Sequence, residues 1–149
     1  ITADKTGTGS YLPITFVTGG SERMRIDTAG NVLVTNSTGG LGYGTGAGGT
    51  VTQLTNKSTA VTLNKPTGKI TMNNASLAAG GTVEFTLNNS LLGGTDMLVV
   101  AGVAYSFNYT ISVKTAISNS AVIRVTNVTG TSQSDPLEIQ FAVIKGATA

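Results

Sequence analysis

Residues 39–49 of the chain read GGLGYGTGAGG, and seven of these eleven residues are glycine. Glycine takes positive φ angles and packs closely against other backbone, which other residue types do only with strain. Short, polar and charged strand-like pieces precede this stretch, whereas a longer region of cleaner apolar alternation follows it. The stretch therefore predicts a joint between two structural parts.

The joint contains Gly44, Gly46 and Gly49 in the spacing G-x-G-x-x-G, which occurs in loops that bind phosphate groups. That motif needs a strand before it and a helix after it, because the helix N-terminus holds the phosphate. Residues 50–55 instead read TVTQLT, which alternate and offer no helix start. We therefore interpret the glycines as a joint and expect no cofactor.

The composition excludes several classes of site. The 149 residues include no cysteine and no histidine, so the usual general base, the usual catalytic-triad partner and the commonest metal ligands are missing. Charged residues make up 11% and the net charge is +2, too little for a nucleic-acid interface. The longest apolar run, residues 97–104, is broken by Gly102 and is too short to insert into a membrane. We expect no metal, no nucleic acid and no membrane insertion.

Apolar residues nowhere recur at helical spacing for three turns, and Thr, Val, Ile and Gly dominate, so we expect an all-β protein. The division is residues 1–40, a joint at 41–59, and residues 60–149 as a β-sandwich, jelly-roll-like in its connections. Residues 97–101 predict a buried strand, and residues 105–114 a strand with Tyr105, Phe107 and Tyr109 facing the core. The predicted strands are 14–18, 23–28, 32–35, 61–63, 69–77, 83–88, 97–101, 105–114, 121–125 and 137–143.

Residues 1–40 contain too few apolar side chains to form a core alone, and a sheet of two or three strands is marginal in water. Their buried face needs a partner, and the simplest partner is another copy of the same chain.

Catalysis by carboxylates needs two of them across the scissile bond, as in glycoside hydrolysis. In residues 60–149, Glu84 and Glu138 alternate with apolar neighbours, while Asp96 and Asp135 follow turn patterns. We interpret these four as structural and expect no enzyme, leaving open a catalytic pair assembled between subunits. The chain's carboxylates are Asp4, Glu22, Asp27, Glu84, Asp96, Asp135 and Glu138.

Two segments resemble known proteins. Residues 21–32, SERMRIDTAGNV, resemble the ERMRI…GNV unit that recurs in the shafts of bacteriophage and prophage tail fibres. Residues 41–53, LGYGTGAGGTVTQ, are similar to a glycine-rich segment that introduces C-terminal domains in many phage structural proteins. The resemblance implies a homotrimer on the virion, with a β-rich shaft and a distal knob that touches the host. The trimer interface is then expected at Phe16, Met24, Ile26 and Val32.

The leading interpretation is a non-enzymatic fibre tip that binds a bacterial surface glycan or outer-membrane protein. One alternative is a purely structural virion component, such as a head fibre, decoration or baseplate protein. The other is a tailspike-like depolymerase, for which the chain offers no room for the long β-helical body usual in such proteins.

The receptor-binding loops are predicted by counting antiparallel strands from residue 60, taken as the shaft-proximal end of the sandwich. The count places the loops at 89–96 and 115–120 at the distal end, and the loop at 129–135 on the shaft side. Polar residues on loops are typical binding groups. The candidate receptor-binding residues are Asn89, Ser90, Thr95, Asp96, Ser118 and Asn119.

Overall fold

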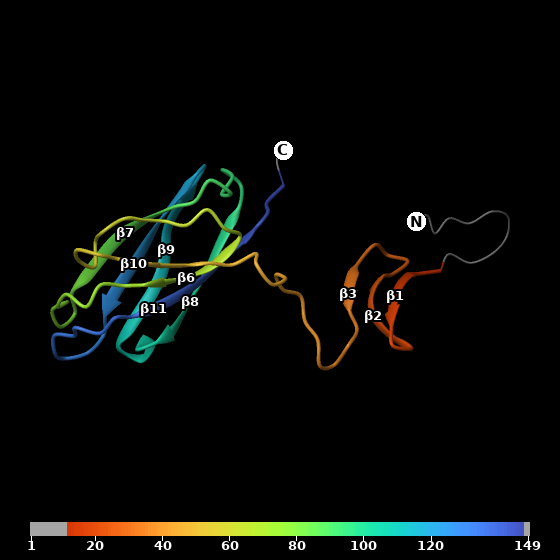
Figure 1. The fold of residues 1–149 in the computed structure, drawn as a ribbon, viewed down its shortest axis with the longest axis horizontal. Coiled ribbons are helices and arrows are strands. Elements are labelled where there is room, and N and C mark those ends of the chain that lie inside the picture. Colours follow the sequence, from red (N-terminus) through yellow and green to blue (C-terminus); the bar gives the residue numbers. More distant parts are fainter. Residues whose placement is uncertain (1–11, 148–149) are drawn as a thin grey trace. The chain divides into compact units, whose positions relative to one another are not determined.

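The computed structural model describes residues 12–147, and the chain divides into two compact units, Ile1–Gly42 and Tyr43–Ala149. The described residues form β-strands, turns and one short 3-10 turn, with no α-helix. The all-β prediction is therefore confirmed (Figure 1). Each unit is described by itself.

The first unit is an antiparallel sheet of three strands in the order β1-β2-β3. A two-residue turn joins the first two strands, with positive φ at both Gly19 (58°) and Gly20 (75°), as tight hairpins require. The second turn is closed by the Asp27 carboxylate, which accepts hydrogen bonds from the backbone N–H of Ala29 (3.0 Å) and Asn31 (2.9 Å). The strands are β1 (Ile14–Thr18), β2 (Ser21–Ile26) and β3 (Val32–Val34).

The second unit contains two four-stranded sheets, in the orders β5-β7-β10-β9 and β4-β6-β11-β8. The short β4 and β5 pair in parallel with β6 and β7, and the remaining pairs are antiparallel. The strands are β4 (Thr50–Thr52), β5 (Val61–Thr62), β6 (Thr67–Thr71), β7 (Thr82–Asn88), β8 (Met97–Ala104), β9 (Tyr109–Ile117), β10 (Ser120–Asn127) and β11 (Glu138–Ile144).

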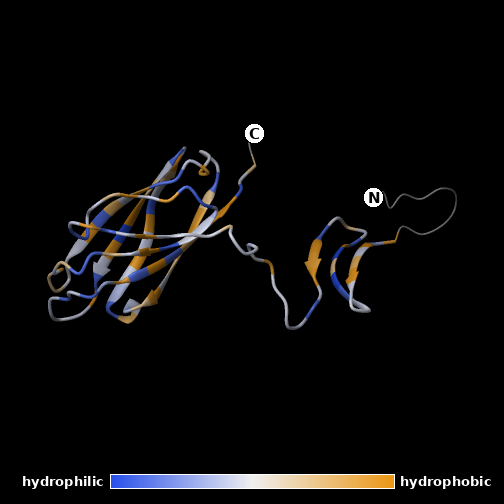
Figure 2. Cartoon of the chain, viewed as in Figure 1, coloured by the Kyte–Doolittle hydropathy of each residue, from blue (hydrophilic) through white to orange (hydrophobic). Residues whose placement is uncertain are grey.

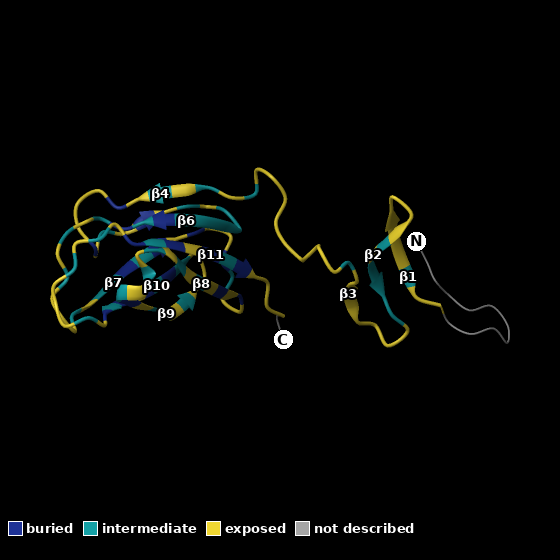
Figure 3. Cartoon of the chain, turned by 90° about the horizontal axis from the view of Figure 1, so that it is seen from below, coloured by how far each residue is buried: buried dark blue, intermediate teal, exposed yellow. Residues whose placement is uncertain are grey.

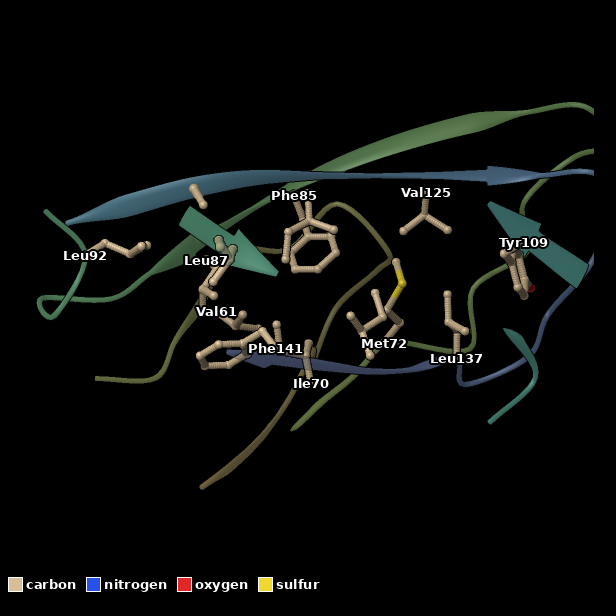
Figure 4. Close-up of a cluster of buried hydrophobic side chains, with 14 of the residues drawn as sticks. Val61, Ile70, Met72, Phe85, Leu87, Leu92, Tyr109, Val125, Leu137 and Phe141 are labelled. Carbon is tan, nitrogen blue, oxygen red and sulfur yellow. The ribbon is translucent and has the colours of Figure 1, made fainter. Parts of the chain in front are cut away.

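The core of the second unit lies between the two sheets (Figure 4). Successive strand residues point to opposite faces, so the alternation in β10 buries Ile123 and Val125 completely. The same alternation in β11 buries Ile139 and Phe141 from the other side. This arrangement is the sandwich that the sequence predicted, although β4 brings residues 50–52, predicted as part of the joint, into one of its sheets.

The loops of the second unit gather at two ends. At the entry end, where the chain comes in at Tyr43, the Tyr43 hydroxyl donates to the Val143 carbonyl and the Asn89 amide donates to the Lys65 carbonyl (2.8 Å). At the far end, buried Lys57 donates to the carbonyls of Asn73 (2.7 Å) and Asp135 (2.6 Å). The two sets of loops are separated by the length of the strands (Figure 1).

The predicted placement of the loops at the two ends of the sandwich was wrong. β4 carries the chain along the sandwich to the far end before Val61, so β5 runs back towards the entry end, opposite to the direction assumed, and every later loop is reversed. Consequently residues 89–96 and 118–119 lie at the entry end with Tyr43, while residues 129–135 lie at the far end with Lys57.

The predicted strand at 105–114 begins four residues late, at Tyr109. Tyr105 adopts a left-handed conformation (φ 59°), and a 3-10 turn at Ser106–Asn108 carries the chain from β8 in one sheet to β9 in the other. Tyr105 and Phe107 are 45% and 81% exposed, so their predicted place in the core was wrong. Tyr109 is buried as predicted.

The prediction of a buried strand at 97–101 holds for one face only. Leu98 is buried and Val100 half-buried, whereas Met97, Val99 and Ala101 are exposed on the outer side of the sheet. The strand is eight residues long and extends to Ala104.

Candidate functional site

One face of the first unit carries a continuous set of apolar side chains. Register places Phe16 beside Met24 and Met24 beside Val34, while Ile26 lies between Ile14 and Val32. Residues directly opposite each other on neighbouring strands project to the same side of a sheet. We call this set the first-unit face; it consists of Ile14, Phe16, Met24, Ile26, Val32 and Val34.

The first-unit face is uncovered within the single chain. None of the residues from 12 to 42 is buried, and Phe16 and Val32 are 40% and 62% exposed (Figures 2 and 3). On the other face Arg25 lies between Thr15 and Leu33, and it forms an ion pair with Glu22 (3.7 Å) near the β-bulge that follows Phe16. The structure thus brings together Phe16, Met24, Ile26 and Val32, the residues predicted to meet other chains, on one side of one sheet.

The six predicted receptor-binding residues also come together, at the entry end, but they differ in exposure. Asn89 is fully buried: its amide donates to the Lys65 carbonyl and its side-chain oxygen accepts from the backbone N–H of Leu91 (3.0 Å). Its backbone N–H donates to the Asn119 carbonyl (2.9 Å), which ties the two predicted loops to each other. Asn89 therefore organises the loops and, being buried, is not accessible to a ligand.

Asp96 is likewise a structural group. Its carboxylate accepts hydrogen bonds from Lys145 Nζ, from the Gly93 backbone N–H (2.7 Å) and from the Gly146 backbone N–H (3.0 Å). These bonds, that of Lys145 above all, lower the pKa of Asp96 to about 2. The charged carboxylate thus fastens the end of β11 to the loop before β8. The remaining candidates, Ser90, Thr95, Ser118 and Asn119, are exposed.

The far end is built around Asn127, which has no exposed surface. Its amide nitrogen donates to the carbonyls of Leu77 (2.9 Å), Ala78 (3.0 Å) and Thr131 (2.8 Å). Its side-chain oxygen accepts from the backbone N–H (2.9 Å) and the hydroxyl (2.8 Å) of Thr129. One buried side chain therefore fixes two far-end loops against each other.

Exposed apolar side chains lie on neighbouring segments of the far end. The backbone N–H of Val128 donates to the Asn108 carbonyl (3.0 Å), so the turn at 105–108 and the loop after β10 are neighbours. Val128 is exposed, as are Tyr105 and Phe107, and the Asn108 amide donates to the Asp135 carboxylate (2.8 Å). Aromatic side chains on a rigid scaffold are typical anchors of binding sites. The sequence prediction missed Tyr105 and Phe107 because their alternation with Tyr109 continued a strand pattern.

The carboxylates of the second unit act as hydrogen-bond and ion-pair partners. Glu84 contacts Lys114 (2.7 Å) and Arg124 (2.8 Å), whose hydrogen bonds, that of Lys114 first, lower the pKa of Glu84. Glu138 contacts Lys69 at 2.7 Å. A general acid needs the opposite shift, towards neutral pH. Among residues 12–147 no cluster of three or more acidic, His or Cys side chains is placed to hold a metal.

Comparisons of the chain with protein-family models, with curated proteins and with solved structures find no match. In the described part of the chain no helix has the length and apolarity that crossing a membrane would require.

We expect Met24→Asp and Ile26→Asp to destabilise the protein much more than Arg25→Ser does. Each aspartate places a charge on the first-unit face, at a cost of at least about 2 kcal/mol per chain wherever that face is covered. Arg25 projects to the other side, where its ion pair with Glu22 is partly exposed and contributes at most about 1 kcal/mol. Thermal unfolding followed by circular dichroism measures the difference. Equal, small shifts from all three substitutions would mean that the face is not covered.

We expect Asp96 to stabilise the folded chain at neutral pH and to lose this effect in acid. Its folded pKa of about 2 lies below the ordinary value of 3.8, so the contribution is present above pH 3.8 and disappears as the pH falls towards 2. Urea unfolding at a series of pH values, compared between the wild type and Asp96→Asn, measures it. The stability difference should shrink across this window, and a difference that stays constant with pH would contradict the expectation.

Proposed function

We propose that this chain is the distal part of a phage tail fibre, a homotrimer in which the first unit forms shaft and the second forms a non-enzymatic knob that binds the bacterial surface. The observation that carries the proposal is the first-unit face. Six apolar side chains on one side of a three-stranded sheet, with no buried residue among 12–42, need a cover. Copies of the same chain supply it by closed symmetry.

The resemblance of residues 21–32 to the repeating unit of fibre shafts supports the same assignment, because these residues form β2 and the turn that leads into β3. The connections of the second unit support a jelly-roll-like knob. From β4 to β11 the chain changes sheet at every connection except the one between β9 and β10, which are neighbours in one sheet.

The far end is the proposed receptor-binding end. It lies away from Tyr43, where the chain enters the unit. It carries the exposed Tyr105 and Phe107 on a turn that Asn108 ties to Val128 and Asp135, with Val128 itself exposed next to Asn127. The surrounding Thr131, Ser132 and Ser134 are exposed hydroxyl groups suited to a glycan or to polar loops of an outer-membrane protein. Three copies would strengthen weak individual sites through avidity. The protein would then act on the virion surface, outside the host cell.

Two other functions remain as comparisons for the experiments. A structural head-fibre, decoration or baseplate protein would use the same first-unit face without binding cells. A tailspike-like depolymerase would release reducing ends from bacterial polysaccharide. The pairing of Glu84 and Glu138 with basic side chains favours a binding role over acid–base catalysis.

We expect the chain to run in solution as a particle of about 45 kDa, three times its 15.0 kDa mass. Light scattering on a sizing column at micromolar concentration measures this. Met24→Asp should reduce the mass towards that of one chain. A monodisperse 15.0 kDa wild-type particle would refute the fibre proposal.

We expect substitutions at the far end to abolish cell binding. Tyr105→Asn together with Phe107→Ser removes the aromatic anchors, and asparagine tolerates the left-handed backbone at position 105. The matched control is Ser90→Ala together with Ser118→Ala at the entry end. Binding of fluorescently labelled protein to a panel of bacterial strains should fall by about tenfold or more in the first variant only. Loss only in the control would move the receptor site to the entry end, and release of reducing ends would favour the depolymerase.

A further inference from the structure

A second uncovered apolar surface lies on the sandwich. The outer side of β8 presents Met97, Val99, Ala101 and Val103, all exposed, with Met97 at 60% and Val99 at 48%. We call these four residues the β8 stripe. Since β8 is the last strand of its sheet, the stripe runs along the edge of the sandwich. An apolar edge strand left open invites pairing with other chains.

The neighbouring strand continues the apolar surface. Ile144 lies beside Met97, Ala142 beside Val99 and Gln140 beside Ala101. Because alanine side chains are short, a hollow of about 200 Å³ opens here. Its lining residues are Thr67, Val99, Ala101, Gln140, Phe141 and Ala142. The surface therefore combines a projecting end at Met97 and Ile144 with a depression at its middle.

The outer face of the other sheet is polar, as is usual for a sheet face exposed to water. The outer side of β9 carries Thr110, Ser112 and Lys114, and Lys114 reaches across to Glu84. Arg124 contacts the same carboxylate. One outer face is thus polar and ion-paired, while the other is apolar along a whole strand.

The sequence of β8 also indicates that its outer side is covered. Residues 97–104 read MLVVAGVA, a nearly continuous apolar run, which is typical of strands buried on both faces. In the single chain only Leu98 and its alternate neighbours face the core. The run fits a strand whose outer side is also covered.

We propose that the β8 stripe and its β11 neighbours are covered by a second copy of this chain, so that the sandwiches pack on one another as well as the first units. The proposal rests on the homotrimer proposed above. The charged groups of this outer face, Lys69 and Glu138, neutralise each other at 2.7 Å. A copy can therefore approach without bringing like charges together.

The area of this surface explains why contact between the sandwiches depends on the first units. An eight-residue strand is about 26 Å long, so two such strands present roughly 300 Å². A stable interface needs about 800 Å² per partner. The sandwiches therefore meet because the first-unit face already holds the copies together, which raises their local concentration.

The chain has no cysteine, so a single introduced thiol reports on this face alone. The test variant is Val99→Cys, and the matched control is Ser112→Cys on the exposed outer side of β9. Both variants keep all 149 residues. Their mass is checked by light scattering, and the rate of alkylation by iodoacetamide is measured under native conditions. The thiol at position 99 should react about tenfold or more slowly than the thiol at position 112, because reaction requires an accessible thiolate.

The outcomes separate the inference about the β8 stripe from the fibre proposal. A trimer whose two thiols react equally fast would overturn this inference and leave the fibre proposal standing, with the β8 stripe free for another protein. A 15.0 kDa particle would overturn both. In a Met24→Asp background that separates the chains, the rate at position 99 should rise to that at position 112. A rate that stays slow in separated chains would also overturn the inference, since the protection would come from the single chain.

Discussion

The packing of β10 against β11 is the interaction on which the second unit depends. Each is an inner strand of its sheet, with β7 and β9 flanking β10 and β6 and β8 flanking β11. Ile123 and Val125 from one strand and Ile139 and Phe141 from the other fill the space between the sheets. Removing a large side chain from such a contact costs about 2–5 kcal/mol, a large part of the stability of a small domain.

With that core in place, buried amides order the loops. Asn127 at the far end and Asn89 at the entry end each satisfy loop carbonyls and backbone N–H groups that would otherwise be buried without partners. Gln53 does the same between β4 and the loop that follows, donating to the carbonyls of Lys57 (3.1 Å) and Thr59 (2.8 Å). A buried polar group left unpaired costs about 1–3 kcal/mol, so these side chains are tied to their positions. The price is that they offer little to a ligand.

The sequence predicted what depends on local alternation. The all-β class, most strands of the sandwich and the apolar face of the first unit follow from period-2 patterns around residues such as Met24 and Ile123. Prediction from the sequence failed where the pairing of distant strands overrides the local pattern. The apolar alternation in the sequence continues through Tyr105, but the strand does not, because the chain turns there to cross from one sheet to the other. Similarly, β4 joins a sheet directly after the glycine run, and this one strand reversed the assignment of every loop.

The central position of β11 also sets the order in which the second unit can fold. Its partner β6 ends at Thr71 and its partner β8 at Ala104, yet β11 itself begins only at Glu138. Contacts between residues so distant in sequence form slowly, because a long loop must close before they are made. During synthesis, β6 and β8 therefore have no common partner until β11 has left the ribosome. The first unit is built from two local hairpins and can form much earlier. In the proposed trimer, this order would give three growing chains time to meet through their first units before their sandwiches close.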